Sequence, residues 1–351
     1  MKKKIMLVVG ARPNYMKIAP IMSELKKYPD EFEYVFIHTG QHYDKNMGDD
    51  FFKELGLPDV YATLGVGSAT HAYQTAKVME RFELFIDKFN PDLVIVVGDV
   101  NSTLACALVA KKKGIQIAHV EAGLRSYDDS MPEEINRRLT DSISDFLFTH
   151  CREAESNLKK EGITKGISFV GNTMIDSLIK VLPKVREMNK WGGRYILVTL
   201  HRPYNVDNPV RLKRILNVLN DITKFYHVIF PLHPRTKKKF EEFKPFESDI
   251  YFEKPLGYLD FIGAQRNASL VITDSGGVQE ETTYLGVPCL TLRPNTERNI
   301  TISSGTNHLT TISQLESDVR FYINRTIHRT IPSMWDGKAS ERIVNILRRE
   351  L

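Results

Sequence analysis

Short apolar runs alternate with longer segments of helical pattern along the chain. Eleven of these runs have the length and the β-branched content of buried strands. The predicted strands are 4–9, 34–38, 93–97, 116–120, 146–149, 168–170, 195–199, 227–230, 250–252, 270–273 and 289–292. Segments such as 20–27, 72–89 and 211–225 are predicted as helices, and 339–351 as a charged amphipathic helix.

This alternation determines the expected fold class. Buried strands that alternate with helices indicate parallel sheets covered by helices on both faces. Eleven strands are many for one such sheet, so two doubly wound domains are predicted. The best boundary is 182–194, which lacks a clear apolar period and contains Pro183, Gly192 and Gly193.

Composition narrows the class of protein further. The chain has 351 residues, enough for two domains, and a formal net charge of +5. No long Lys/Arg block is present, so an anionic small substrate is favoured over nucleic acid. Cys106, Cys151 and Cys289 are too far apart for a zinc motif and argue against a disulfide framework, which indicates a reducing compartment. The apolar runs are too short for a signal peptide or a membrane span, and we expect a cytoplasmic protein with no membrane partner.

The most informative junction is Ser275-Gly276-Gly277, between the predicted strand 270–273 and a segment without Pro or Gly up to Gly286. Backbone N–H groups at such a helix start favour phosphate, and Gly lets the backbone approach an anion closely. Glu281, a few residues on, could accept hydrogen bonds from sugar hydroxyls. The alternative is a strand–turn–helix junction that binds nothing.

Charged residues also follow the strands of the first half. Arg12 and Lys17 flank the turn after the first strand, where they could meet a diphosphate or a sugar or form a solvated basic turn. Asp99 follows strand 93–97, where it could face a ligand or cap a helix. Glu121 follows strand 116–120, where burial would raise its pKa and suit it to proton transfer. Glu133 lies in a predicted first helical turn, where complementation of the helix dipole is the simpler explanation.

In the second half, a histidine follows each of two neighbouring predicted strands. His201 follows strand 195–199 and His233 follows strand 227–230, and each can meet phosphate or move protons near neutral pH. A single histidine would more often be packed or capped. The sequence has no Gly-x-Gly-x-x-Gly after its first strand and no Walker A motif, which disfavours nicotinamide and NTP chemistry.

Taken together, these junctions resemble those of the non-hydrolysing UDP-N-acetylglucosamine 2-epimerases. The resemblance runs in collinear order over most of the chain, from Gly10 to Arg298. Its most specific parts are Thr39-Gly40-Gln41-His42, 119–126, 132–137, 170–176, 274–281 and Gly286-Val287-Pro288.

The resemblance implies a GT-B architecture: two Rossmann-like domains around a cleft, here residues 1–182 with the C-terminal helix 337–351, and residues 183–336. It also implies a homodimer with a UDP-hexosamine substrate and without cofactor or metal. Asp99, Glu121, Glu133 and His201 are expected to carry the chemistry on the sugar. The UDP group is expected to bind to Arg12, Lys17, His201, His233, Ser275, Gly276, Gly277, Glu281 and Arg298.

The implied reaction explains these residue types. Inverting C2 requires loss of an unactivated proton, and expulsion of UDP from C1 drives that step through a glycal intermediate. The site therefore needs acid–base carboxylates and a strong diphosphate clamp. A hydrolysing epimerase, a GT-B glycosyltransferase and a binding protein without turnover are the alternatives, the last disfavoured by the three carboxylates.

The chain departs from the family pattern in three places. His201-Arg202-Pro203-Tyr204-Asn205 replaces His-Arg-Arg-Glu-Asn, and His233-Pro234-Arg235 replaces His-Pro-Asn. Segment 65–71 lacks the arginine that many bacterial members use to bind an activating second UDP-GlcNAc. The departures leave the exact sugar and the activator site open.

Overall fold

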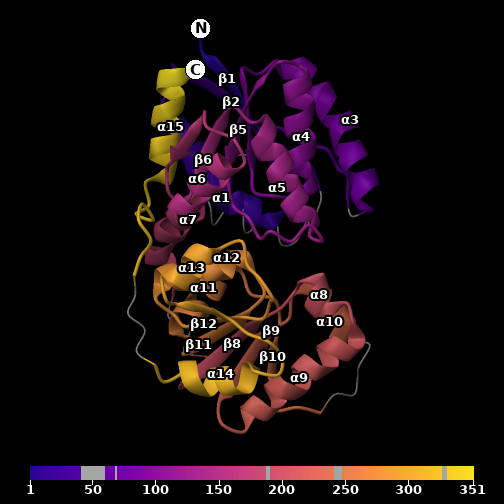
Figure 1. Ribbon diagram of the computed structural model, residues 1–351, viewed down its shortest axis with the longest axis vertical. Coiled ribbons are helices and arrows are strands. Elements are labelled where there is room, and N and C mark those ends of the chain that lie inside the picture. The colour runs from indigo at the N-terminus through magenta and orange to yellow at the C-terminus, as the bar shows by residue number, and fades with distance from the viewer. Residues whose placement is uncertain (41–59, 68, 187–189, 241–246, 326–329) are drawn as a thin grey trace. The chain divides into compact units, whose positions relative to one another are not determined.

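The computed structural model describes residues 1–40, 60–67, 69–186, 190–240, 247–325 and 330–351. The chain folds into two compact units, residues 1–180 with 333–351 and residues 181–332 (Figure 1). The sequence analysis placed the corresponding boundaries at 182/183 and 336/337. We propose that these units are the two expected domains.

The first unit contains a parallel sheet of seven strands in the order β3-β2-β1-β4-β5-β6-β7. The strands are β1 (Lys3–Val9), β2 (Phe32–His38), β3 (Ala62–Thr63), β4 (Leu93–Val97), β5 (Gln116–Val120), β6 (Phe146–Thr149) and β7 (Ile167–Phe169). The helices of the unit are α1 (Arg12–Leu25), α3 (His71–Phe89), α4 (Asn101–Lys112), α5 (Pro132–Ile143), α6 (Arg152–Lys160), α7 (Thr173–Val181) and α15 (Ala339–Glu350).

The core of this unit follows from the alternation of side chains along its strands. Met6 and Val8 of β1 pack with Val94 and Val96 of β4 against the apolar stripe of α3 and α4. Helix α15 lies beside α1, so the end of the chain packs near its beginning (Figure 1). An ion pair between Arg348 and Glu31 closes this contact at 2.8 Å.

The second unit contains a parallel sheet of six strands in the order β10-β9-β8-β11-β12-β13. The strands are β8 (Tyr195–Thr199), β9 (His227–Pro231), β10 (Tyr251–Glu253), β11 (Leu270–Thr273), β12 (Cys289–Thr291) and β13 (Asn307–Leu309). The helices are α8 (Pro203–Val206), α9 (Pro209–Thr223), α10 (Pro234–Phe240), α11 (Tyr258–Asn267), α12 (Gly276–Leu285), α13 (Asn299–Ser303) and α14 (Leu315–Tyr322), and Leu182–Lys184 forms a 3₁₀ turn.

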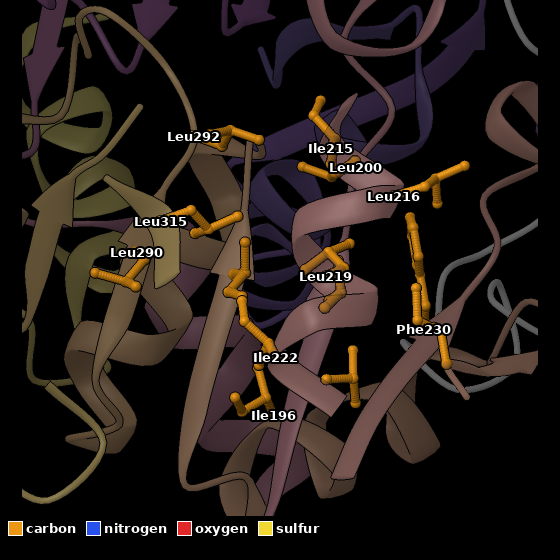
Figure 2. Packing of buried hydrophobic residues seen from close by; sticks show 14 of the residues in the cluster. Ile196, Leu200, Ile215, Leu216, Leu219, Ile222, Phe230, Leu290, Leu292 and Leu315 are labelled. Atoms are coloured by element: carbon orange, nitrogen blue, oxygen red, sulfur yellow. The ribbon is translucent and has the colours of Figure 1, made fainter. Parts of the chain in front are cut away.

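One face of this sheet packs against α9 and α14. Figure 2 shows Leu219 and Ile222 of α9 beside Ile196 of β8, with Leu315 of α14 near Leu290 of β12. All these side chains are buried. Helix α9 presents Leu212, Ile215, Leu216, Leu219 and Ile222 to the sheet, at the spacing of one helical face. This packing fixes the strands whose ends carry the polar residues.

The two parallel sheets confirm the predicted α/β class and all eleven predicted strands, with ends that differ by at most two residues. Two edge strands, β3 and β13, are not predicted because neither is an apolar run: β3 is Ala62-Thr63 and β13 is Asn307-His308-Leu309. The predicted helix start at Pro20 is wrong. Helix α1 begins at Arg12 and continues through Pro20.

Two further expectations concern the cysteines and membrane-spanning segments. The three cysteines are free and buried. Among the residues that the structure describes, no helix combines the length and apolar character that a membrane span requires.

Candidate functional site

Several candidate residues follow the strands between which each sheet changes its winding direction. In the first unit the chain winds from β1 toward β3 and then restarts at β4 toward β7; in the second it winds from β8 to β10 and restarts at β11. Ligands of doubly wound sheets bind outside the carboxyl ends of the strands at such a point. Asp99 follows β4, and His201 and Ser275 follow β8 and β11.

In the first unit, Lys17 and Glu121 form a buried ion pair. The Lys17 ammonium lies 2.8 Å from Oε1 and 2.7 Å from Oε2 of Glu121. Both side chains are buried. The expectation for Glu121 considered burial alone, whereas the ammonium stabilises the charged carboxylate and opposes that effect. Lys17 was expected near a diphosphate, but its ammonium contacts the carboxylate of Glu121, a candidate acid–base group.

The backbone around this pair is unusual. Glu121 has φ +74°, a left-handed conformation that glutamate rarely adopts. Gly98 has φ +67°, and a Cβ added to it would lie 3.0 Å from Nζ of Lys17. The turn after β4 therefore lies directly against the Lys17–Glu121 pair, and any side chain at position 98 would crowd it.

Asp99, the second candidate carboxylate, is held by α5. Arg137 donates to Oδ2 of Asp99 from Nε at 3.1 Å and from Nη2 at 2.9 Å. Asn136 donates to the backbone carbonyl of Asp99 at 2.9 Å. The Asp99 side chain is 19% exposed, whereas that of Arg137 is buried. The carboxylate is thus oriented from one side and accessible from another.

Two adjacent glutamates on α5 differ in their surroundings. Glu134 is fully buried; it accepts hydrogen bonds from the backbone N–H groups of Ser126 and Tyr127 and pairs with Arg137. Glu133 is only partly buried in the first turn of α5. The structure therefore gives Glu134 a structural role and leaves Glu133 as the candidate for chemistry.

The turn after β1 is fixed by Asn14. Its Oδ1 accepts from the backbone N–H groups of Gly10 and Ala11, and its Nδ2 donates to the carbonyl of Val97 at 3.1 Å. Arg12 is the first residue of α1. The side chain of Arg12 and the residues Gln41 and His42 lie outside the described part of the chain.

In the second unit, Asp274 organises the turn that contains His201. It accepts from the backbone N–H of His201 at 3.0 Å and of Arg202 at 3.0 Å, and from Asn205 Nδ2 at 3.0 Å. It also lies 3.3 Å from Nδ1 of His201. Asp274 is fully buried. The two turns after β8 and β11 are therefore connected through one carboxylate.

His201 and His233 lie beside each other, with ring centroids 5.1 Å apart. Burial lowers the pKa of His201 below its ordinary value; Asp274 acts against this effect, while Arg202, Arg235 and Arg293 reinforce it. The imidazole is thus favoured in its neutral form while it is surrounded by guanidinium groups. An anion bound beside it would reverse this balance.

The start of α12 has the geometry of an anion site. Ser275 is the N-cap residue, but its hydroxyl makes no capping hydrogen bond, so it does not occupy the first N–H groups. The Arg298 guanidinium packs against Gly276, where an added Cβ would lie 2.4 Å from Nη1. Gly277 follows in the first turn. Arg298 is buried and forms ion pairs with Glu297 and Glu280.

Glu281, the expected ribose contact, lies one turn further along α12. It is buried, and Oε2 accepts from Nε2 of Gln265 on α11 at 2.6 Å. Gln265 itself is fully buried. This hydrogen bond therefore fixes the orientation of the carboxylate.

Sequence reasoning missed the residues that hold the candidates in place. Asn136, Arg137, Gln265 and Asp274 all contact a predicted site residue. Asn136, Arg137 and Asp274 stood as amide or charged residues within the quoted motifs, whereas Gln265 lies outside them and gave no signal. Arg81 was also missed: it donates to the carbonyl of Gly65 at 2.9 Å and so contacts segment 65–71, which itself contains no arginine. Within the described residues, no group of three His, Cys, Asp or Glu side chains is placed to hold a metal ion.

Comparison with known proteins gives consistent results. Residues 23–348 match the sequence model of a family described as UDP-N-acetylglucosamine 2-epimerase. The chain is 44% identical to the UDP-N-acetylglucosamine 2-epimerase of Methanocaldococcus jannaschii, with 98% of each chain covered. It is 39% identical to the UDP-2,3-diacetamido-2,3-dideoxy-D-glucuronate 2-epimerase of Pseudomonas aeruginosa, with 98% of this chain and 99% of the relative covered.

The structural comparison extends this similarity. A crystal structure of the M. jannaschii UDP-GlcNAc 2-epimerase in complex with UDP-GlcNAc and UDP matches with a TM-score of 0.93 at 43% identity, over 99% of both chains. The glycosyltransferase SnogD from Streptomyces nogalater matches with a TM-score of 0.53 at 12% identity, over 100% of this chain and 96% of that one, which shows a shared fold alone. The predicted GT-B-like fold is thereby confirmed.

Proposed function

This chain belongs to the UDP-N-acetylglucosamine 2-epimerase family of isomerases, and from that membership we propose that it reversibly converts UDP-N-acetylglucosamine to UDP-N-acetylmannosamine. The observation that carries the proposal is a pair of oriented carboxylates. Glu121 forms an ion pair with Lys17, and Asp99 forms one with Arg137. A protein that only binds a nucleotide sugar has no need of them.

We propose that the second unit holds UDP. The α12 N-terminus at Ser275, Gly276 and Gly277 would receive the diphosphate, with His201 and His233 as further partners, and Glu281 would accept from the ribose hydroxyls. Arg298 would support this turn from beneath Gly276, as its ion pairs with Glu297 and Glu280 indicate. These contacts would stabilise UDP as a leaving group.

The first unit would supply the proton chemistry. A carboxylate among Asp99, Glu121 and Glu133 would remove the C2 proton while the bond from C1 to the UDP oxygen breaks, which gives a 2-acetamidoglucal and UDP. Return of a proton to the opposite face of C2 and re-addition of UDP at C1 would complete the inversion. Lys17 and Arg137 would hold two of these carboxylates in their charged form.

Incubation with UDP-N-acetylglucosamine in heavy water tests this function. We expect the C2 epimer to form and deuterium to enter C2 of both sugars. Proton NMR detects both changes. Epimerisation without any exchange at C2 would overturn the elimination route. Net release of UDP and free N-acetylmannosamine would instead identify a hydrolysing epimerase, and transfer to an acceptor without epimerisation would identify a glycosyltransferase.

A modified substrate pair is the second candidate. The P. aeruginosa relative is named for a diacetamido-dideoxy-glucuronate, and this chain differs from the common motif at Pro203 and Tyr204. Comparing turnover of UDP-N-acetylglucosamine with that of UDP-2,3-diacetamido-2,3-dideoxy-D-glucuronate distinguishes the two.

We also propose that the protein is a homodimer. Light scattering on the protein as it elutes from a size-exclusion column would measure its molar mass and test this proposal.

Binding of the nucleotide sugar is expected to take up a proton. The pKa of His201 lies below its ordinary value in the free protein, so the ring is mainly neutral at pH 7. A diphosphate beside it stabilises the imidazolium, so the complex binds more protons than the free protein. Affinity should therefore rise as pH falls from 8 and level off once the free ring is also protonated.

Calorimetry in two buffers of different ionisation enthalpy measures this uptake at constant pH. UDP-N-acetylglucosamine is the appropriate ligand, because its diphosphate diester does not itself titrate near neutral pH. The His201→Asn variant should remove most of the buffer dependence. Proton release on binding to the unaltered protein would contradict the assignment.

A further inference from the structure

His119 is a fully buried histidine to which the proposed chemistry assigns no role. It lies on β5, two residues before Glu121. Its Nδ1 is 2.7 Å from Oδ1 of Asp141 on α5, and its Nε2 is 2.9 Å from the backbone carbonyl of Gly98. The ring therefore bridges the turn that carries Asp99 and the helix that carries Glu133.

The partners of the ring determine its orientation. The Gly98 carbonyl can only accept a hydrogen bond, so Nε2 must donate. Asp141 also accepts from Arg125 Nη1 at 2.7 Å and from the N–H of Gly123 at 3.1 Å. Burial acts to raise the pKa of Asp141, but His119 and Arg125 outweigh it and hold that pKa below its ordinary value. Both ring nitrogens thus lie within hydrogen-bond distance of a buried oxygen, which fixes the orientation of the ring.

The contact with Gly98 completes the attachment of one turn to α5. Asn136 holds the Asp99 carbonyl and Arg137 holds the Asp99 carboxylate, both directly from α5. His119 holds the preceding carbonyl through Asp141 of the same helix. Since Gly98 also lies against Lys17, a shift of this turn would displace Asp99 and disturb the Lys17–Glu121 pair together.

We propose that His119 is a positioning residue, whose two hydrogen bonds fix the Gly98–Asp99 turn to α5 so that Asp99 and Glu121 keep their catalytic geometry. The proposal rests on the proposed epimerase function. It concerns the chemical step, because neither contact of the ring involves a residue of the second unit.

Two substitutions separate the two contacts of the ring. His119→Gln can place its amide N–H near the Nε2 position and keep the bond to Gly98, whereas His119→Asn places its N–H near the Nδ1 position and keeps only Asp141. Misplacement of a reacting group by about 1 Å costs about 10²-fold in rate. We expect kcat of His119→Asn to fall by about that factor with KM and UDP affinity unchanged, and His119→Gln to recover much of the loss.

The melting temperatures of both variants are measured together with their rates. A purely structural role would lower the melting temperature of both variants while leaving kcat of the folded fraction unchanged, and that result would overturn the proposal. Equal kcat losses in the two variants would also overturn it, because the contact with Gly98 would then not matter. His227→Asn, at an exposed histidine of the second unit, is the matched control.

A spectroscopic measurement tests the ring independently of turnover. In protein labelled with ¹⁵N-histidine, the ring resonances that His119→Asn removes should show a hydrogen on Nε2, as the contact with the Gly98 carbonyl requires. An Nε2 without hydrogen would overturn the proposal even in an active enzyme. A protein that shows this Nε2 hydrogen bond but no epimerisation or C2 exchange would instead refute the proposed function.

Discussion

Replacing Glu121 by glutamine is expected to lower kcat by about 10²–10⁴-fold, the usual contribution of a positioned acid–base group. The amide keeps the size of the side chain, and its oxygen can still accept a hydrogen bond from Lys17, so the buried ammonium is not left without an acceptor. What is lost is the ability to exchange a proton with C2. Affinity for UDP should change little, because the residues proposed to hold UDP lie mainly in the second unit.

The measurement is the initial rate of epimerisation together with the rate of deuterium entry at C2. Both should fall by the same factor, because the same proton transfer underlies them. Glu33→Gln, at an exposed glutamate of β2 in the same unit, is the matched control and should retain the full rate. Near-normal turnover by Glu121→Gln would remove this residue from the chemistry.

The strands and their polar ends were predictable because the signal is local. A run such as Leu93–Val97 is apolar at every position, which is how a strand buried on both faces reads. The next residues, Gly98 and Asp99, stand at the carboxyl end by sequence adjacency alone. The candidate residues that follow strands could therefore be named before the order of the strands was known.

The contacts that orient these residues were not predictable in the same way. Arg137 reaches Asp99 across 38 positions, and Asp274 reaches His201 across 73. Such pairs depend on which strands and helices become neighbours, and a single sequence does not state that. The φ of +74° at Glu121 was missed for a related reason, since it depends on the packing of the turn and not on the preference of glutamate.

Gly276→Ala is expected to have the second large effect, on UDP binding and on stability together. A Cβ at this position would lie 2.4 Å from Nη1 and 2.5 Å from Cζ of Arg298. An exposed arginine would move aside, but Arg298 is buried and held by Glu297 and Glu280. Displacing it breaks two buried ion pairs, and because Glu297 keeps Arg293 at 2.8 Å, we expect a loss of no more than about 3–5 kcal/mol. The start of α12 would shift as a consequence, and UDP affinity should fall at least about tenfold.

A double-mutant cycle with Arg298→Met identifies the clash as the cause. Each single variant should lower the free energy of unfolding and the UDP affinity. In the Arg298→Met background the added methyl group meets no guanidinium, so the further loss from Gly276→Ala should be much smaller than in the unaltered protein. Coupling between residues in contact is typically about 0.5–3 kcal/mol. Additive losses would mean that alanine at position 276 acts directly on the phosphate contact, because the Cβ itself would then obstruct the approach of the anion to the helix N-terminus.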